Sequence, residues 1–389
     1  MKQLLAYCLS IILCVSFTGC MENYLDLYPE DKITSASFPE NESDIKLLLN
    51  GVYAQLREKE VYNQGLFGFG ITDGATPNAF NWGTDEVFNK LGAGRLSSSD
   101  GGVVTYRWKR CYEIISRANY LLACMDLVDL SEEAKAKYSG ETHFLRGLAY
   151  SVLAETYGGV PIILTDISTE EARSLKRASL EETWQQALDD YEVAITNLGV
   201  DAPEPGRATK GAALGMKMRA YLYQGKYKEV LSCVEQIDAL KKYGLFHSYE
   251  GLFDPANENN KEVLFDIQYI EGENSQGSYI DQYCGTGTGS WTRGSRYVPT
   301  DDLVAAYETI DGSPVDPENP YENRDPRLGF TAVLPGSYFL GYRFPNYLYP
   351  GGAFNHAGNR LKHLSTRKYR IQDESKLPPS GQSYINDII

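Results

Sequence analysis

The chain has 389 residues, of which 42% are hydrophobic, and a formal net charge of -15. This length allows one large domain or two smaller ones and a sizeable core. The acidic balance, without a block of Lys and Arg, excludes nucleic acid as a partner and disfavours polyanions, because both need a concentrated basic surface.

The N-terminal residues have the plan of a secretory signal. A basic start at Lys2 precedes an apolar run over residues 4–17, and small residues then lead into Cys20. The run is shorter than the roughly 20 residues that a transmembrane helix needs. A small residue before a cysteine resembles the bacterial lipoprotein signal, which predicts removal of residues 1–19 and acylation of Cys20. A plain signal peptide with an incidental cysteine is the alternative.

Four further cysteines follow in the mature chain: Cys111, Cys124, Cys233 and Cys284. Their spacings match no metal pattern, and we predict no metal and no cofactor. Export permits disulfides. The apolar helical contexts of the first three favour small buried side chains instead.

Helical spacing of apolar residues dominates the first two thirds of the chain. The predicted helices cover residues 42–58, 104–128, 131–158, 179–198, 209–222 and 226–241. Ser179 and Glu182 form a capping box, the signature of a helix start. We expect these helices to form antiparallel pairs, and residues 220–227 resemble the closing part of a tetratricopeptide repeat. The sequence therefore predicts a mainly α fold.

Two long irregular portions accompany the predicted helical scaffold. The scaffold lies mainly in residues 40–60 and 103–243, and a loop-rich binding portion lies mainly in residues 61–102 and 244–389. Within the second portion we expect a strand over residues 263–269 and a helix over residues 299–309. Long loops on a rigid scaffold are commonly functional, so we treat residues 20–389 as one domain with its binding site in these loops.

Catalytic signatures are missing from the sequence. The four histidines have no His-Glu-x-x-His spacing, and no Gly-x-Ser-x-Gly elbow occurs. Residues 285–289 alternate Gly and Thr without the Gly-Lys-Ser/Thr of a phosphate loop, which favours a flexible loop. Carboxylates are plentiful, so their number alone leaves a pair for glycoside hydrolysis open, but none lies in a recognisable catalytic motif. We predict no catalytic residue.

Two glycine-rich loops combine aromatic rings with amide, carboxylate and guanidinium groups. The first group is Asp73, Asn78, Phe80, Asn81 and Trp82, and the second is Trp291, Arg293, Arg296 and Tyr297. Sugars have apolar C–H faces and a rim of hydroxyls, so flat rings with polar neighbours suit them. We predict a carbohydrate site in these loops. The alternative is that the rings only anchor the loops to the helical body.

Several stretches in order resemble the SusD/RagB family of outer-membrane nutrient-binding lipoproteins. They are residues 20–26 with Pro29, residues 141–150 continuing to 157–161, residues 177–179 with Glu182, residues 206–213, Asp311 with Gly312, and residues 324–328. In the second stretch, Arg146 lies one turn from Tyr150, and Gly147 and Ala149 allow close backbone approach. This part of the motif is therefore interpreted as a packing device.

The resemblance implies a fold, a partner and a location. The fold is a set of tetratricopeptide-like helix pairs that cradle an irregular binding portion. The partner is a SusC-like TonB-dependent barrel, to which the lipoprotein delivers a glycan or oligopeptide at the outer membrane, with its anchor facing the cell surface. The ligand positions that match are Asp73 and the loop of Trp82, followed by the loop of residues 291–297. Alternatives are a surface glycoside hydrolase and a protein–protein scaffold without a small ligand.

The resemblance also carries an expectation about the end of the chain. Family members continue past a segment like residues 384–387 into a further helix that carries Arg-x-Ala-Glu, whereas this chain stops at Ile389. We therefore expect a C-terminally short member whose last family helix is missing.

Overall fold

The computed structural model describes residues 38–57, 73–81, 90–97, 99–101, 103–268, 297–339, 342–343 and 365–367. Six helices of more than two turns form the body: α2 (Glu42–Tyr53), α6 (Val103–Cys124), α7 (Glu132–Tyr157), α9 (Leu180–Asn197), α10 (Lys210–Tyr223) and α11 (Tyr227–Ala239). Each coincides with a predicted helix. The mainly helical fold is confirmed.

Smaller elements follow the body or connect its helices. They are the short helices α8 (Thr169–Ser174), α13 (Asp301–Ala306) and α14 (Arg327–Thr331), the 3-10 turns η1 (Ala54–Arg57), η2 (Gly251–Phe253) and η3 (Pro255–Asn257), and the strands β1 (Ala79–Asn81), β2 (Tyr297–Pro299), β3 (Ala332–Val333), β4 (Tyr338–Phe339), β5 (Tyr342–Arg343) and β6 (Ser365–Thr366). The strands pair antiparallel, β1 with β2, β3 with β6 and β4 with β5. Among the described residues every sheet therefore has only two strands.

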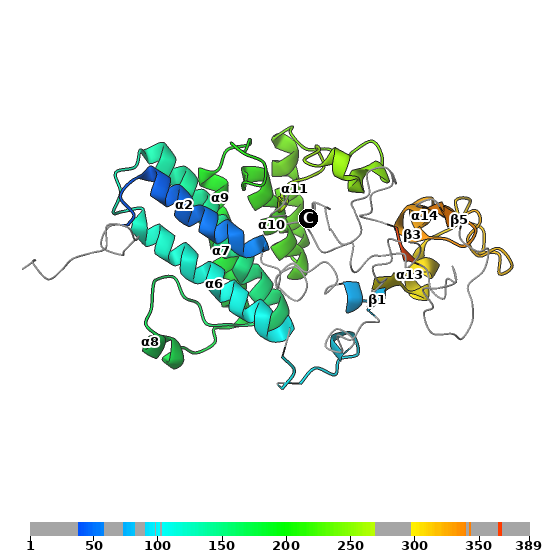
Figure 1. Ribbon diagram of the computed structural model, residues 1–389, viewed down its shortest axis with the longest axis horizontal. Helices are drawn as coiled ribbons and strands as arrows, with labels where there is room; N and C mark the ends of the chain where they lie inside the picture. Colours follow the sequence, from blue (N-terminus) through cyan, green and yellow to red (C-terminus); the bar gives the residue numbers. More distant parts are fainter. Residues whose placement is uncertain are drawn as a thin grey trace, which may run out of the picture.

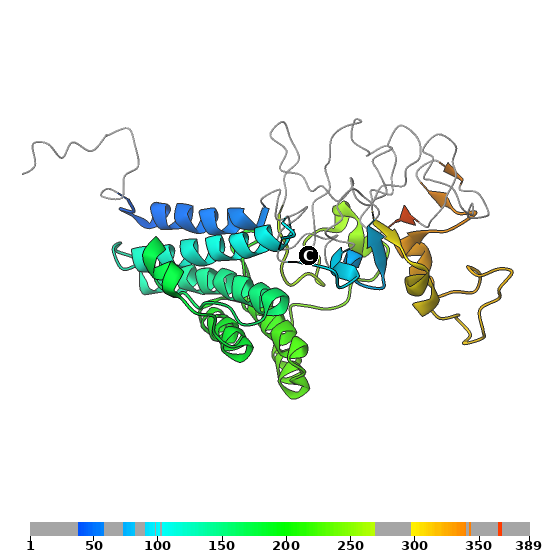
Figure 2. The same ribbon diagram turned by 90° about the horizontal axis from the view of Figure 1, so that it is seen from below.

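The helices are layered around α7. Figure 2 shows α2 (dark blue) lying along α6 (cyan), with α7 beneath them and the hairpin of α10 and α11 at one side. α7 packs against α9, α6, α2 and α10, and residues 140–154 of this helix are buried except His143. Its position makes α7 the centre of the core.

Local sequence signals set where several of the body helices begin. Ser131 caps α7, and Ser179 with Glu182 forms the predicted capping box of α9. Thr209 caps α10 by accepting a hydrogen bond of 3.1 Å from the amide of Ala212. Each cap satisfies a backbone amide that lacks an intrahelical partner. The helix starts could therefore be read from the sequence.

A buried ion-pair network joins three of these helices. Arg146 of α7 donates to both carboxylate oxygens of Asp190 of α9, at 3.0 and 2.7 Å. Its third nitrogen donates to Asn119 Oδ1 of α6 at 2.7 Å, and His143 Nδ1 lies 2.7 Å from Asp190. Burial acts to raise the pKa of Asp190, but the hydrogen bonds from His143 and Arg146 outweigh it and lower that pKa. The interpretation of this motif as a packing device is confirmed.

A second buried network joins α2, α7 and the start of α10. The Tyr53 hydroxyl donates to Glu141 Oε2 at 2.8 Å and accepts from the Ala208 amide at 3.0 Å. Arg207 Nη1 lies 3.5 Å from the same Glu141 oxygen. Burial raises the pKa of Glu141, and Tyr53 and Arg207 offset only part of this rise.

The raised pKa of Glu141 predicts a pH dependence of stability. A group whose pKa is higher in the folded state stabilises most below its unfolded pKa, which is about 4.3 for Glu. That contribution is lost as the pH rises through the raised folded pKa. We therefore expect the unfolding free energy of the wild type, relative to Glu141→Gln, to fall in urea titrations as the pH rises above about 4.3, the unfolded pKa. Plots of unfolding free energy against pH that run parallel for the wild type and Glu141→Gln would contradict this. Glu155→Gln, on the exposed side of α7, is the control.

The described cysteines behave as core residues. Cys111, Cys124 and Cys233 are free and buried, as the helical contexts predicted, and burial raises the pKa of all three thiols. Cys20 and Cys284 lie outside the described residues.

The predicted strand over residues 263–269 does not form as an element over residues 263–268, where only Ile267 makes an isolated β-bridge, and residue 269 lies outside the described residues. The Phe265 ring lies 5.0 Å from the ring of Phe144 in α7, and Leu264 lies against Gly215 of α10. The side chains of this run cover the helical body, which accounts for its apolar composition without a paired strand along its length. The predicted helix over residues 299–309 is present but shorter, as α13.

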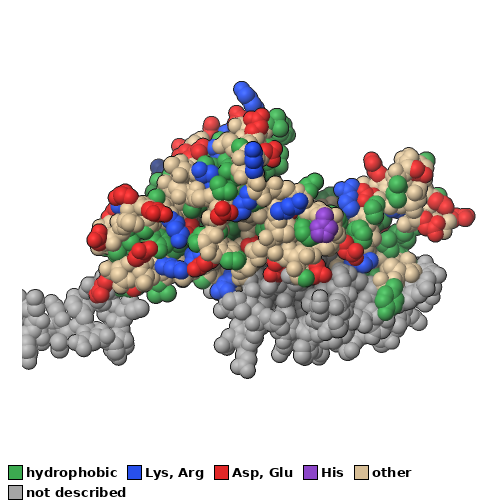
Figure 3. All heavy atoms as spheres, turned by 90° about the horizontal axis from the view of Figure 1, so that it is seen from above, with side chains coloured by type: hydrophobic (Ala, Val, Ile, Leu, Met, Phe, Trp, Pro, Cys, Tyr) green, Lys and Arg blue, Asp and Glu red, His purple; other side chains and the backbone are tan. Residues whose placement is uncertain are grey.

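Charged side chains are mixed over the surface. On the face shown in Figure 3, acidic and basic groups are interspersed along the helical body, without a continuous basic patch among the residues described there.

Candidate ligand-binding site

The two loops that the sequence singled out meet at a two-stranded ribbon. β1 and β2 pair antiparallel, with Ala79 opposite Pro299, Phe80 opposite Val298 and Asn81 opposite Tyr297. All the body helices from α6 to α11 lie between these strands in the sequence. Figures 1 and 2 show the ribbon beside α13, at the end of the helical body. The fold thus places Asn81 of the first predicted group opposite Tyr297 of the second.

Thr300 fastens the ribbon to its neighbours. Its amide donates to the Asn78 carbonyl at 3.0 Å, and its hydroxyl donates to the Pro77 carbonyl. The same hydroxyl oxygen accepts from the Leu303 amide at 3.1 Å, which caps α13. One side chain therefore holds the segment before β1, the end of β2 and the start of α13 in register. Sequence reasoning missed this role, although Thr300 before two aspartates is a recognisable helix start.

A compact turn leads into β1. The Thr76 amide and hydroxyl both donate to the Asp73 carbonyl, at 3.0 and 2.9 Å, and the Asn78 amide donates to the Thr76 hydroxyl at 3.1 Å. Asp73 is half-buried, and the Asn78 side chain is exposed at the ribbon. An exposed amide can donate and accept hydrogen bonds at once, which suits a hydroxylated ligand.

The structure places only part of the predicted ligand set. Asp73 and Asn78 are described, and the backbones of Asn81 and Tyr297 face each other across the ribbon. The predictions for Trp82, Trp291, Arg293 and Arg296, and for acylation at Cys20, fall outside the described residues. All of them remain predictions.

An arginine inside the motif of residues 324–328 organises the region beyond α13. Arg324 is buried and donates to the carbonyl of Pro320 at 2.6 Å and to the carbonyls of Val304 and Tyr307. The last two carbonyls lie at the C-terminal end of α13, where a positive charge is favourable. This motif is structural, and it fixes the far side of the element that the ribbon leads into.

The described residues contain neither a candidate metal site nor a membrane-spanning helix. No group of three or more His, Cys, Asp or Glu side chains in the described part of the chain could hold a metal ion. None of the described helices combines the length and apolar character needed to cross a membrane.

The architecture defines a class of protein. Its members have a scaffold of antiparallel helix pairs, which here carries the β1–β2 ribbon and irregular segments at one end. A family model described as starch-binding and associating with the outer membrane matches residues 23–222, more than half of the chain. The SusD family model matches residues 261–384. The chain belongs to the SusD family, as the motifs of its sequence predicted.

Individual relatives agree with this assignment. A SusD-like protein of Formosa agariphila is 26% identical over 321 residues, which cover 77% of this chain and 58% of the relative. A SusD-like carbohydrate-binding protein of Bacteroides fragilis superposes with a TM-score of 0.77 and 26% identity, over 89% of this chain and 70% of that one. A laminarin-binding SusD-like protein shares the fold, with a TM-score of 0.68 and 19% identity over 89% of this chain and 76% of its own. This chain therefore spans just over half of the length of the first curated relative.

Proposed function

We propose that this protein is a cell-surface lipoprotein that captures oligosaccharide and delivers it to a SusC-like TonB-dependent transporter of the outer membrane. In this proposal residues 1–19 are the signal peptide, and the acylated Cys20 tethers residues 20–389 to the membrane. The helical body is the scaffold. The ligand contacts come from Asp73, Asn78, Asn81, Trp82, Trp291, Arg293, Arg296 and Tyr297.

The observation that carries the proposal is the pairing of β1 with β2. A sugar site needs ring faces and polar groups close together, and the ribbon joins the two segments that supply both kinds of residue. Membership of a family described as starch-binding supports carbohydrate as the ligand class. Binding by ring stacking and hydrogen bonds requires no bond to be broken, so we propose a receptor and not an enzyme.

Affinity electrophoresis in gels containing soluble starch or laminarin tests this function. We expect one of these glucans to retard the wild type, and the double variant Trp82→Ala with Trp291→Ala to bind about 100-fold more weakly, since each buried ring contributes at least about 1.5 kcal/mol. Tyr227→Ala, which removes an exposed ring of α11 that is distant in sequence from both loops, should migrate as the wild type does.

Three outcomes would contradict the proposal. Retardation that survives the double substitution would show that these loops do not bind the glucan. If the wild type migrates freely in both gels, these glucans are not its ligands. That result would favour a scaffold without a small ligand. Release of shorter sugars on incubation, followed by thin-layer chromatography, would favour the hydrolase.

A further inference from the structure

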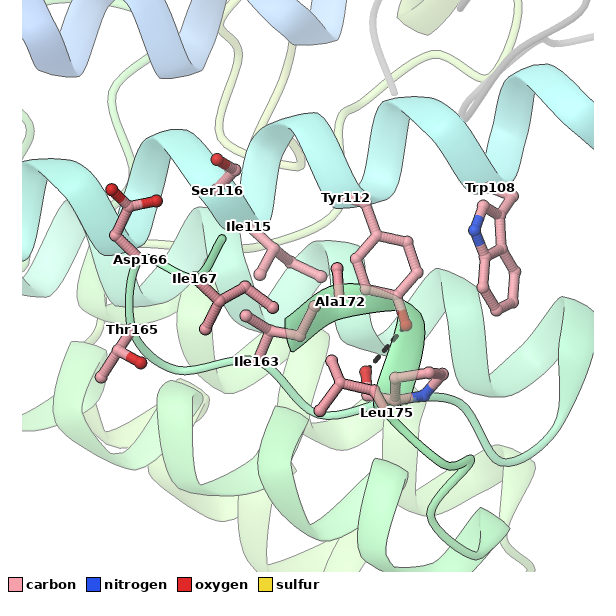
Figure 4. Close-up of a pocket in the computed structure, with 11 residues that line it drawn as sticks. Trp108, Tyr112, Ile115, Ser116, Ile163, Thr165, Asp166, Ile167, Ala172 and Leu175 are labelled. Atoms are coloured by element: carbon pink, nitrogen blue, oxygen red, sulfur yellow. Dashed lines mark hydrogen bonds between the residues drawn. The ribbon is translucent and has the colours of Figure 1, made fainter. Parts of the chain in front are cut away.

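A pocket of about 330 Å³ opens between α6 and the segment of residues 161–175, which connects α7 to α9 (Figure 4). Trp108, Tyr112 and Ile115 lie on one face of α6 because they are spaced by four and three residues. Ile163 and Ile167 line the wall opposite them. The pocket lies on the helical body and shares no residue with the predicted ligand set.

The first half of the connecting segment is tied to the helices beneath it. The Tyr112 hydroxyl donates to the Pro161 carbonyl at 2.7 Å (Figure 4). The Tyr150 hydroxyl accepts from the Ile163 amide at 2.8 Å and donates to the Ile163 carbonyl at 2.9 Å. Asn119 donates to the carbonyls of Ile163 and Thr165 at 2.9 and 3.3 Å. This wall of the pocket is therefore fixed before any partner arrives.

The second half of the segment arches away from the body. It contains α8, which has no buried residue and stands apart from the other helices in Figure 1. The pocket is the space between the first half of the segment and this arch. Ala172 and Leu175 line it on the side of the arch. Binding at this place requires no large rearrangement, since the space is already formed.

The lining decides what can enter. Most of it is hydrocarbon or ring surface, and the polar side-chain groups are the indole N–H of Trp108, the hydroxyls of Tyr112, Ser116 and Thr165 and the carboxylate of Asp166, of which the Tyr112 hydroxyl already donates to Pro161. A sugar would have hydroxyls facing isoleucine side chains, and each unpaired one would cost about 1–3 kcal/mol. An anionic ligand would meet Asp166, and no Lys or Arg is among the lining residues. A large apolar group with a neighbouring cation fits best.

The backbone beside the pocket points to a polypeptide and not to a small molecule. Residues 161–164 are neither helical nor paired in a sheet, and the backbone groups of Ile162 and Leu164 form no hydrogen bond with another described residue. Leu164, between two residues that line the pocket, is 46% exposed. Unpaired backbone groups next to an apolar pocket can accept an extended segment by main-chain hydrogen bonds.

We propose that this pocket is a docking site for a polypeptide partner, which inserts one large apolar side chain between α6 and residues 161–175. The partner backbone runs beside residues 162–164, and a Lys or Arg next to its anchor residue faces Asp166. This surface binds its partner independently of any glycan at the β1–β2 ribbon.

Isoleucine-methyl NMR of the protein locates the binding directly. The probe is a pool of pentapeptides with Phe, Leu, Ile or Met at the centre and Lys beside it, compared with the same pool carrying Ser at the centre. We expect the apolar pool to shift the methyl signals of Ile115, Ile163 and Ile167, and to bind at least about tenfold more tightly than the Ser pool. The signal of the core residue Ile45 should stay in place.

Variants test whether the pocket itself is responsible. Ala172→Trp should fill the pocket and abolish the shifts, while Ala239→Trp, at an exposed position of α11, should leave them. Asp166→Lys should weaken binding of the pool with Lys and restore binding of a pool with Glu at that position. None of these three substitutions should alter retardation by starch or laminarin, which separates this inference from the proposed function.

Equal binding of the apolar and Ser pools, or no shift with either, would overturn the inference. So would shifts that persist in Ala172→Trp. Shifts of the same three methyl signals by starch or laminarin oligosaccharides would instead make the pocket a sugar site, and the docking proposal would then be wrong.

Discussion

Substituting alanine for Gly159 should prevent the native fold from forming at ordinary temperatures. A Cβ atom at this position would lie 2.0 Å from the Ala178 carbonyl oxygen and 2.9 Å from the Leu180 amide nitrogen. Both are backbone atoms at the start of α9, so neither can move without displacing that helix. We expect a loss of more than about 4 kcal/mol, the range reserved for severe packing conflicts.

The matched change at Gly199 should be harmless. The nearest atom to a Cβ there is the Asp201 carbonyl oxygen at 3.5 Å, an ordinary contact. Gly199→Ala should be neutral or stabilise by about 0.4–1 kcal/mol through the unfolded chain. Circular dichroism and urea unfolding of both variants compare them, and a Gly159→Ala protein as stable as Gly199→Ala would refute the close approach of residues 158–159 to α9.

Removing the carboxylate of Asp190 should cost about 3–5 kcal/mol of unfolding free energy. Asp190→Ala would leave Arg146, which is only 5% exposed, without its bidentate partner, and an uncompensated buried charge carries a penalty of this size. Asp190→Asn should cost less, because one acceptor oxygen remains for Arg146.

The neighbouring aspartate supplies the control for this experiment. Asp189 is exposed on the same helix and accepts a hydrogen bond from Gln185 one turn away. Its replacement by Ala should change stability by no more than about 0.5 kcal/mol. Urea titrations at neutral pH measure all three variants. Equal midpoints for Asp190→Ala and Asp189→Ala would contradict a structural role for the Arg146 network.

Features encoded within a few residues were predictable. The start of α9 follows from Ser179 and Glu182, which bond each other's backbone amides in the capping box. The same signal precedes α8 at Ser168 and Glu171, and α8 could have been predicted from it. The burial of Cys111 followed from its place on the apolar face of a helix.

Features that depend on distant partners were not predictable. The run of residues 263–268 has the composition of a strand, but it forms only a single bridge at Ile267, and its apolar side chains contact Phe144 and Gly215 of the helical body. Arg146 was identified from the motif, but its partner Asp190 lies on another helix. The pairing of β1 with β2 could not be foreseen, because three-residue strands have no measurable alternation and the register depends on Thr300.

The ribbon of β1 and β2 also orders events during synthesis. Its second strand leaves the ribosome only after the whole helical body has emerged, and such long-range contacts form after local ones. A nascent or prematurely released chain that ends before residue 297 would therefore possess its helices without its ribbon. Synthesis beyond residue 297 is thus required before the proposed glycan site can form.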